Sequence, residues 1–296
     1  MSASAGGAKP WIAFAACGLI WGSTFLVIDL GNEALAPLWA ASLRLVLATV
    51  LLGVWMIARR IPMPRGRALT AAVGHGICQF AINFPLLYWA ERHVPSGMAA
   101  VLYATVPLSS ALMVRAMGLE PLTLAKLAGA VTALAGVAIL FSASLRGDVP
   151  PVGLLTILFA ANVSGFGVVL LKRGPRQSPV GANAVGCAIG AVVSLVASAV
   201  MREPHALPTT FAAAAPVLYL TLAGSLGAFV LMSWLVNHWP VTRTSYVSII
   251  VPIIALALGA IVRGQTVTAT AGAGCLLIFV GLLIGMRRRR VAPATP

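Results

Sequence analysis

The sequence contains few charged residues, and very few of these are acidic. Charged side chains make up 9% of the 296 residues, with 20 Lys and Arg against only six Asp and Glu. A soluble globular domain carries about 25% charged residues. Because so few charges cannot cover the surface of a water-soluble fold of this length, the composition excludes an ordinary soluble enzyme or binding domain.

Cysteine and metal-binding patterns are equally sparse. The four cysteines are Cys17, Cys78, Cys187 and Cys275, and all of them lie inside apolar segments without the spacing of a metal site. We expect small buried hydrophobic residues rather than disulfides or ligands, and no metal or cofactor. The sequence has no HExxH or GxSxG motif, and its four histidines are scattered. These absences disfavour a membrane-embedded enzyme, the alternative from a different functional class.

Long apolar segments dominate what is present, since 60% of the residues are hydrophobic. A membrane-spanning helix needs about 20 consecutive apolar residues. Ten segments meet that length, roughly 10–30, 36–58, 68–90, 96–117, 121–145, 150–172, 179–201, 211–237, 241–262 and 267–286. The sequence therefore predicts an all-α polytopic membrane protein with ten transmembrane helices and no separate soluble domain.

The net charge of +14 is distributed unevenly between the two sides of these spans. With a cytoplasmic N-terminus, 15 basic residues, including the run Arg287–Arg290, fall inside and four fall outside. This bias is typical of inner-membrane proteins with positively charged cytoplasmic loops. It predicts a bacterial inner-membrane location with both termini cytoplasmic, and it favours a topology anchor at the lipid headgroups over nucleic-acid binding.

The chain also repeats itself at an offset of 145 residues. The matched residues are Trp89, His93, Pro95, Pro107, Gly129 and Gly136 in the first copy and Trp234, His238, Pro240, Pro252, Gly274 and Gly281 in the second. Five predicted spans separate the copies, so the second copy is inverted. We predict two inverted five-helix repeats, at 10–145 and 150–288, as are frequent in secondary transporters.

At this point the chain resembles the drug/metabolite transporter superfamily, EamA type, over nearly its whole length. The resemblance rests on Ile20–Phe25, on Arg44, on Leu119–Thr123 and on the glycines that follow. It implies the outward transport of metabolites, often amino acids, across the bacterial inner membrane. Within the superfamily the chain looks most like the amino-acid exporters related to YddG. It departs at Gln265, where such families usually have an acidic residue.

Polar residues within the predicted spans are the candidates for binding a substrate. In the third span His75, Gln79 and Asn83 are four residues apart and share one helix face. Their positions 145 residues later are apolar, which favours lining of a substrate cavity over interhelical packing. The other candidates are Trp21, Ser23, Thr24, Tyr103, Asn162, Ser164, Ser245, Tyr246 and Ser248. Trp21 could equally pack against protein or stack on a substrate.

Arg44 is the only basic residue deep within a predicted span. A structural role, pairing with Asp29 or Glu33 or extending to the surface, is favoured over binding a substrate carboxylate. His93 and His238 are expected to be structural.

Pro85, Pro107 and Pro252 are candidates for helix kinks. The spacing of Gly129 and Gly136, repeated at Gly274 and Gly281, predicts close helix packing.

The most consistent function is alternating-access export of a small molecule, an amino acid with an aromatic or neutral side chain, by a monomer. Export of drugs or nucleobases on the same fold is the alternative. Coupling to protons is open, because no acidic residue is expected to be deeply buried. His75 is then the one mid-span group suited to protonation near neutrality.

Overall fold

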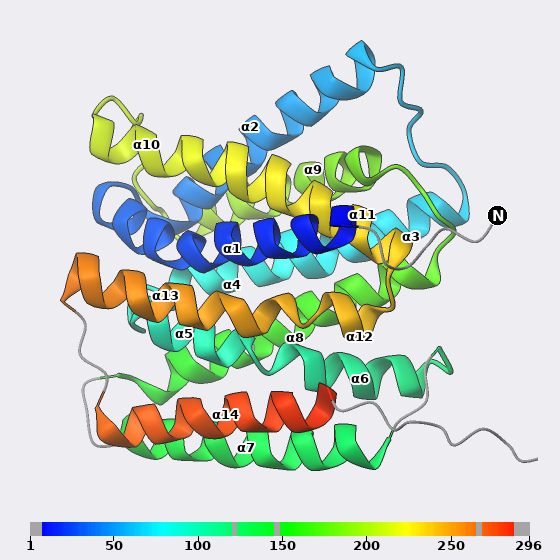
Figure 1. The fold of residues 1–296 in the computed structure, drawn as a ribbon. Helices are drawn as coiled ribbons and strands as arrows, with labels where there is room; N and C mark the ends of the chain where they lie inside the picture. Colours follow the sequence, from blue (N-terminus) through cyan, green and yellow to red (C-terminus); the bar gives the residue numbers. More distant parts are fainter. Residues whose placement is uncertain (1–7, 120–122, 145–148, 265–267, 287–296) are drawn as a thin grey trace, which may run out of the picture.

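The computed structural model in Figure 1 describes residues 8–119, 123–144, 149–264 and 268–286, and all regular structure within these residues is helical. Six helices or joined helices are long and apolar enough to cross a membrane. They span Ala8–Ala34, Pro37–Ala58, Ser96–Ala116, Pro151–Arg173, Pro179–Val200 and Phe211–His238. Shorter apolar helices complete the bundle, which confirms an all-α fold of the membrane-protein type.

The elements of the first half are α1 (Ala8–Ala34), α2 (Pro37–Ala58), α3 (Arg67–Gly76), η1 (Ile77–Ile82), α4 (Asn83–Ala90), α5 (Ser96–Tyr103), α6 (Val106–Ala116) and α7 (Leu124–Ser144). Those of the second half are α8 (Pro151–Arg173), α9 (Pro179–Val200), α10 (Phe211–Tyr219), η2 (Leu220–Ala228), α11 (Phe229–His238), α12 (Val241–Thr244), α13 (Val247–Arg263) and α14 (Ala269–Met286). Several segments expected as uniform helices are thus interrupted.

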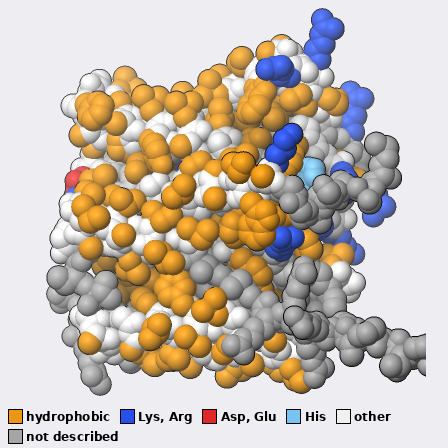
Figure 2. Space-filling model, in the orientation of Figure 1, with side chains coloured by type: hydrophobic (Ala, Val, Ile, Leu, Met, Phe, Trp, Pro, Cys, Tyr) orange, Lys and Arg blue, Asp and Glu red, His pale blue; other side chains and the backbone are white. Residues whose placement is uncertain are grey.

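The bundle has two ends of opposite character. The acidic end, defined here by Asp29, Glu33, Glu91 and Glu203, contains the ends of α1, α4 and α13 and the start of α2. The basic end contains the start of α1, where Trp11 lies 4.9 Å from the Arg243 guanidinium. On the face drawn in Figure 2, Lys and Arg side chains gather at this end. The separation matches the distribution of charge in the sequence.

Glu203 connects the link after α9 to the first turn of α2. Its carboxylate accepts hydrogen bonds from the backbone N–H groups of Leu38 and Trp39, at 3.2 and 2.8 Å, and from Ser198 Oγ at 2.9 Å. The first residue of α2 is Pro37, which has no N–H to satisfy, and Ala36 offers no side-chain cap. A carboxylate also interacts favourably with a helix N-terminus, so Glu203 caps α2 from a distant part of the chain.

The helices η1 and η2 are π-helical, with wider turns than an α-helix. Residue 77 lies 145 positions before residue 222, so the two π segments occupy equivalent places in the sequence repeat. The wider turn alters the direction of side chains on either side of it. An α-helical spacing therefore does not describe His75, Gln79 and Asn83, since η1 lies between the first and the last of them.

The repeated glycines bring α7 and α14 into close contact, and these helices lie side by side in Figure 1. A Cβ atom added to Gly136 would lie 2.6 Å from the carbonyl oxygen of Gly274. One added to Gly281 would lie 2.6 Å from the carbonyl oxygen of Gly129. The contact is reciprocal. Gly136 of the first repeat faces Gly274 of the second, and Gly281 of the second repeat faces Gly129 of the first.

The three prolines are placed differently in their helices. Pro107 is the second residue of α6, next to the interruption at Ala104 and Thr105. Pro252 lies inside the continuous helix α13, and Pro85 is the third residue of α4. The residues Glu120–Leu122, Gln265–Val267 and Arg287–Arg290, used in the sequence interpretation, lie outside the described residues.

Candidate functional site

A cavity of about 110 Å³ lies in the middle of the bundle, between helices of both halves. One water molecule needs about 10–15 Å³ measured in this way, so the space accommodates several waters or a small organic molecule. Its walls include Trp21, Thr24, Gln79, Asn83, Tyr103, Ser164, Ser245 and Ser248. The fold therefore brings these eight candidate residues, from distant parts of the sequence, around one space.

His75, the candidate coupling residue, does not line the central cavity. It borders a much smaller cavity of about 10 Å³, which shares Trp21 and Gln79 with the central one. The residue is 3% exposed, and its ring packs edge-on against Phe80. The π helix η1 begins directly after α3. Because its turn is wider, the side chains of His75 and Asn83 point in different directions.

Three other candidates lie outside the cavity wall, and two of them form contacts between or within helices. Ser23 Oγ shares a 2.6 Å hydrogen bond with the Tyr219 hydroxyl, which joins α1 to α10. Asn162 Nδ2 donates to the carbonyl oxygen of Leu158 at 2.6 Å, within α8. Tyr246 is half-buried after α12 and is not part of the cavity wall.

Two amide side chains are fixed on the polar side of the cavity. Ser164 Oγ donates to Gln79 Oε1 at 2.6 Å, so α8 orients the amide carried by η1. The Tyr103 hydroxyl donates to Asn83 Oδ1, which joins α5 to α4. Both amides are buried, and each has an acceptor oxygen with remaining capacity and an NH₂ group. The cavity thus presents oriented donors and acceptors in an apolar setting.

Arg44 places a buried positive charge in the wall of the same cavity. Its side chain is 2% exposed; Nε donates to Ser225 Oγ at 2.9 Å and Nη1 donates to the Tyr88 hydroxyl at 3.3 Å. The guanidinium carbon also lies 4.5 Å from the centre of the Phe84 ring. All these neighbours are neutral.

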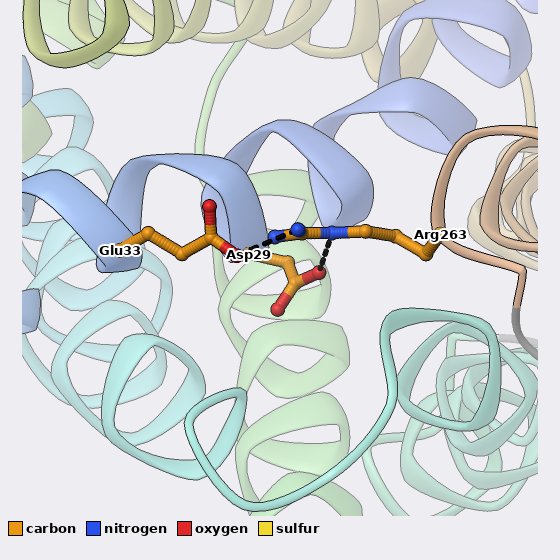
Figure 3. Close-up of polar contacts among 3 residues, drawn as sticks. All are labelled: Asp29, Glu33 and Arg263. Atoms are coloured by element: carbon orange, nitrogen blue, oxygen red, sulfur yellow. Dashed lines mark hydrogen bonds and ion pairs between the residues drawn. The ribbon is translucent and has the colours of Figure 1, made fainter.

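The expected pairing of Arg44 with Asp29 or Glu33 is wrong, because Arg263 occupies both carboxylates. Arg263 Nε lies 2.9 Å from Asp29 Oδ2, and Arg263 Nη1 lies 2.6 Å from Glu33 Oε1 (Figure 3). Asp29 and Glu33 are one turn apart on α1, so they can share one guanidinium from the end of α13. This ion pair connects α1 and α13 at the acidic end, and it leaves Arg44 without an acidic partner among the described residues.

The expectation that no acidic residue is deeply buried is also wrong. Glu91 follows the last residue of α4 and is only 3% exposed. Its position at the end of a segment suggested contact with water. The fold instead buries the side chain, and its charged neighbours Asp29 and Arg44 lie on helices distant in sequence.

Both halves of the chain match the same known protein family. The model of the EamA-like transporter family matches residues 9–142 and again residues 151–286. The chain belongs to the EamA-like transporter family. The inner membrane transporter YedA of Escherichia coli K12, named as uncharacterized, is 31% identical over 94% of this chain and 90% of its own length.

Other EamA-like relatives have names that refer to amino-acid export. A probable amino-acid metabolite efflux pump of Salmonella typhimurium is 28% identical, over 93% of this chain and 94% of its own. A probable terminal-alkyne amino-acid exporter of Streptantibioticus cattleyicolor is also 28% identical, with the same coverage. A solved crystal structure superposes with a TM-score of 0.69 at 19% identity over 95% of this chain and 97% of that one, which shows the shared fold.

The repeated histidines of this EamA-like chain make the same local contact in both halves. His93 Nδ1 lies 3.2 Å from the carbonyl oxygen of Trp89, and His238 Nδ1 lies 2.7 Å from that of Trp234. Each imidazole also packs on the indole four residues earlier, with ring centres 5.0 and 4.1 Å apart. These pairs close helix ends, and neither borders the central cavity.

The apolar part of the wall was not singled out by the sequence. Phe25, Phe84, Phe229 and Met232 line the cavity, and Trp21 packs against Phe229 with ring centres 5.2 Å apart. In a chain so rich in apolar residues, no local signal distinguishes a cavity-facing Phe from one that faces lipid. The Nε1–H of Trp21 is buried and has no hydrogen-bond acceptor among residues 8–119, 123–144, 149–264 and 268–286, so it can serve as a further donor for a ligand.

Proposed function

We propose that this protein exports amino acids with aromatic or neutral side chains across the bacterial inner membrane by alternating access. The observation that carries the proposal is Arg44, a buried guanidinium in the cavity wall whose hydrogen-bond and ring contacts among the described residues are all with neutral side chains. Buried charges require compensation, and a substrate carboxylate provides it through charge-assisted hydrogen bonds. The names of the relatives YedA, the efflux pump and the terminal-alkyne amino-acid exporter support a membrane exporter of this kind.

The remaining wall suits the rest of an amino acid. The side-chain oxygens of Gln79 and Asn83 can accept hydrogen bonds from the substrate ammonium group. The aromatic wall formed by Trp21, Phe84 and Phe229 provides an apolar surface for an aromatic or neutral side chain. Such a cavity, mostly apolar with a few oriented polar groups, has the general character of small-molecule sites.

The proposed architecture is ten membrane spans arranged as two inverted five-helix repeats, at 10–145 and 150–288, in a monomer. Two separate matches to the family model support the repeats. The reciprocal contact of α7 with α14 supports an approximate two-fold axis between them, because a contact of this form is what a two-fold axis produces. Both termini are proposed to lie in the cytoplasm, on the side of the basic end.

Transport by protein purified and reconstituted in liposomes tests the substrate. We expect saturable uptake of labelled aromatic and neutral amino acids, and little uptake of bulky cationic drugs or nucleobases. Uptake confined to drugs or nucleobases would favour the alternative substrate class and contradict the proposal.

Replacing Arg44 tests its role directly. Arg44→Gln removes the charge and keeps hydrogen-bond donors, and we expect about a 10- to 100-fold loss in apparent affinity, because charged hydrogen bonds contribute about 1.5–3 kcal/mol. Arg44→Lys, which retains a positive charge, should lose less. Unfolding temperatures of both variants must stay near that of the wild type for this comparison. Equal affinity in Arg44→Gln and wild type would exclude a carboxylate contact.

A further inference from the structure

Glu91 is a buried carboxyl group that the proposed substrate site does not use. It lies at the acidic end, in the link between α4 and α5, and both of its oxygens are buried without a hydrogen-bond partner in the part of the chain that the structure describes. Most acidic residues of soluble and membrane proteins reach water or a cation when charged. Among the described residues, Glu91 contacts no cation, and its side chain is shielded from water.

The ionisable groups around Glu91 come from four helices. Asp29 on α1 repels a negative charge at Glu91, and Arg44 on α2 attracts it. Tyr88 on α4 and Tyr103 on α5 are its other titratable neighbours. On α13, Arg263 is held by Asp29 and Glu33 instead. Burial and the nearby Asp29 raise the pKa of Glu91 well above its usual range. The positive charge of Arg44 lowers this pKa but does not offset the two effects that raise it.

An ionised carboxylate in such a place is costly. Transfer of an unpaired charge into a protein interior has a desolvation cost of several kcal/mol, so the group takes up a proton instead. The neutral acid is compatible with this conformation, in which Glu91 is buried at the acidic end. Movement of α1 or α13 that opens this end would expose the carboxyl group to water, where an ordinary glutamate has a pKa of about 4.3.

We propose that Glu91 is a proton-binding site whose protonation is coupled to closure of the acidic end of the cavity. A proton bound from the solution at this end neutralises Glu91 and permits closure, and opening releases the proton. The coupling group is thus Glu91 rather than His75. The inference rests on one part of the proposed function, alternating access, in which the acidic end opens and closes.

The sign of the pH effect follows from the two environments. Glu91 has the higher pKa in the closed state. The preference of the protein for the closed state is therefore complete at pH values below the ordinary pKa of the exposed group. That preference is lost as the pH rises toward the raised pKa of the closed state. Between the two values, the ratio of open to closed molecules increases by up to tenfold per pH unit.

Thiol labelling of the reconstituted full-length protein measures this ratio without a substrate. The reporter is Leu87→Cys, which lines the cavity one turn before Glu91, in a protein whose four native cysteines are replaced by alanine. A membrane-impermeant maleimide is applied between about pH 5 and pH 8. The exposed position Ala34→Cys at the same end, measured in parallel, corrects for the pH dependence of the thiol reaction itself.

With Glu91 intact, we expect corrected labelling to rise steeply with pH. Glu91→Gln and Glu91→Met, both permanently neutral, should label slowly at every pH, and having two variants guards against a folding failure in one of them. Asp29→Asn, which removes the neighbouring carboxylate instead, should keep a pH response. His93→Gln and His205→Gln, at the same end, should keep it unchanged.

Two results would overturn the proposal. One is corrected labelling that does not depend on pH when Glu91 is intact. The other is a wild-type pH response that persists in both neutral variants. The assay reports opening rather than flux. It can therefore support the role of Glu91 in a protein that transports no amino acid, and it can contradict that role in a protein that does.

Discussion

At the scale of single residues, the cavity depends on close packing around Arg44. A Cβ atom added to Gly224 of η2 would lie 2.8 Å from Arg44 Nη2, a distance at which something must move. The guanidinium approaches the backbone this closely only because position 224 has no side chain. The glycine therefore determines where the buried charge lies.

Gly224→Ala should displace the Arg44 guanidinium and lower the apparent substrate affinity several-fold. An overpacked site costs about 1–3 kcal/mol, so a lower unfolding temperature is expected as well. Gly227→Ala is the matched control on the same π helix, because its Cβ atom would meet other atoms only at 3.4 Å or more. Uptake kinetics and thermal unfolding of both variants provide the measurement. Equal affinities for the two would show that Gly224 does not position Arg44.

At the scale of helices, contacts between distant segments determine which elements pair. The α7–α14 contact is formed by glycines of both repeats, and the start of α2 is capped by a carboxylate from the link after α9. In a membrane, helices associate through close van der Waals packing and hydrogen bonds, since lipid offers no hydrophobic driving force. Both contacts are of these kinds.

Gly136→Leu should separate α7 from α14 and destabilise the protein by about 1–3 kcal/mol. Gly53→Leu introduces the same side chain on α2 where a Cβ atom would meet nothing within 4 Å, so its stability should be close to wild type. Thermal unfolding in detergent compares them. If both variants unfold at the wild-type temperature, the close glycine contact contributes little.

Glu203→Gln should destabilise the start of α2 by about 0.5–2 kcal/mol, the usual range for loss of a helix cap or its charge. Thermal unfolding in detergent at neutral pH measures this loss. An unfolding temperature equal to that of the wild type would show that the charge of Glu203 contributes little to the start of α2.

At the scale of the whole molecule, charge separates the two ends of the bundle. The described acidic residues lie at one end, and most basic residues lie at the other (Figure 2). Because positively charged loops of inner-membrane proteins tend to stay in the cytoplasm, we expect the basic end to lie on the cytoplasmic side. This separation is present in the sequence before any folding.

Single-cysteine variants in intact cells should reveal the orientation. An impermeant thiol reagent should label Ala206→Cys, exposed at the acidic end, from outside. Arg60→Cys, exposed at the basic end, should react only after the membrane is permeabilised. The reverse labelling pattern would place the termini outside the cell and contradict the proposed orientation of the protein in the membrane.

Much of the fold and part of the candidate site could be predicted from the sequence. Apolar segment length, charge bias and the 145-residue repeat each depend on local or periodic patterns, so they indicated the helices, the spacing of Gly129 and Gly136, and several cavity residues. Gln79, Asn83 and Ser164 stood out because polar groups are rare inside apolar segments.

The tertiary structure alone decided the partners and the burial of the charged groups. The π turn of η1 directed His75 away from Asn83, Arg263 took the two carboxylates expected for Arg44, and the turn after α4 buried Glu91. None of these follows from one segment, because each depends on which helices of the two halves lie side by side. Sequence pattern determines whether a residue is compatible with a membrane, whereas packing determines what it faces there.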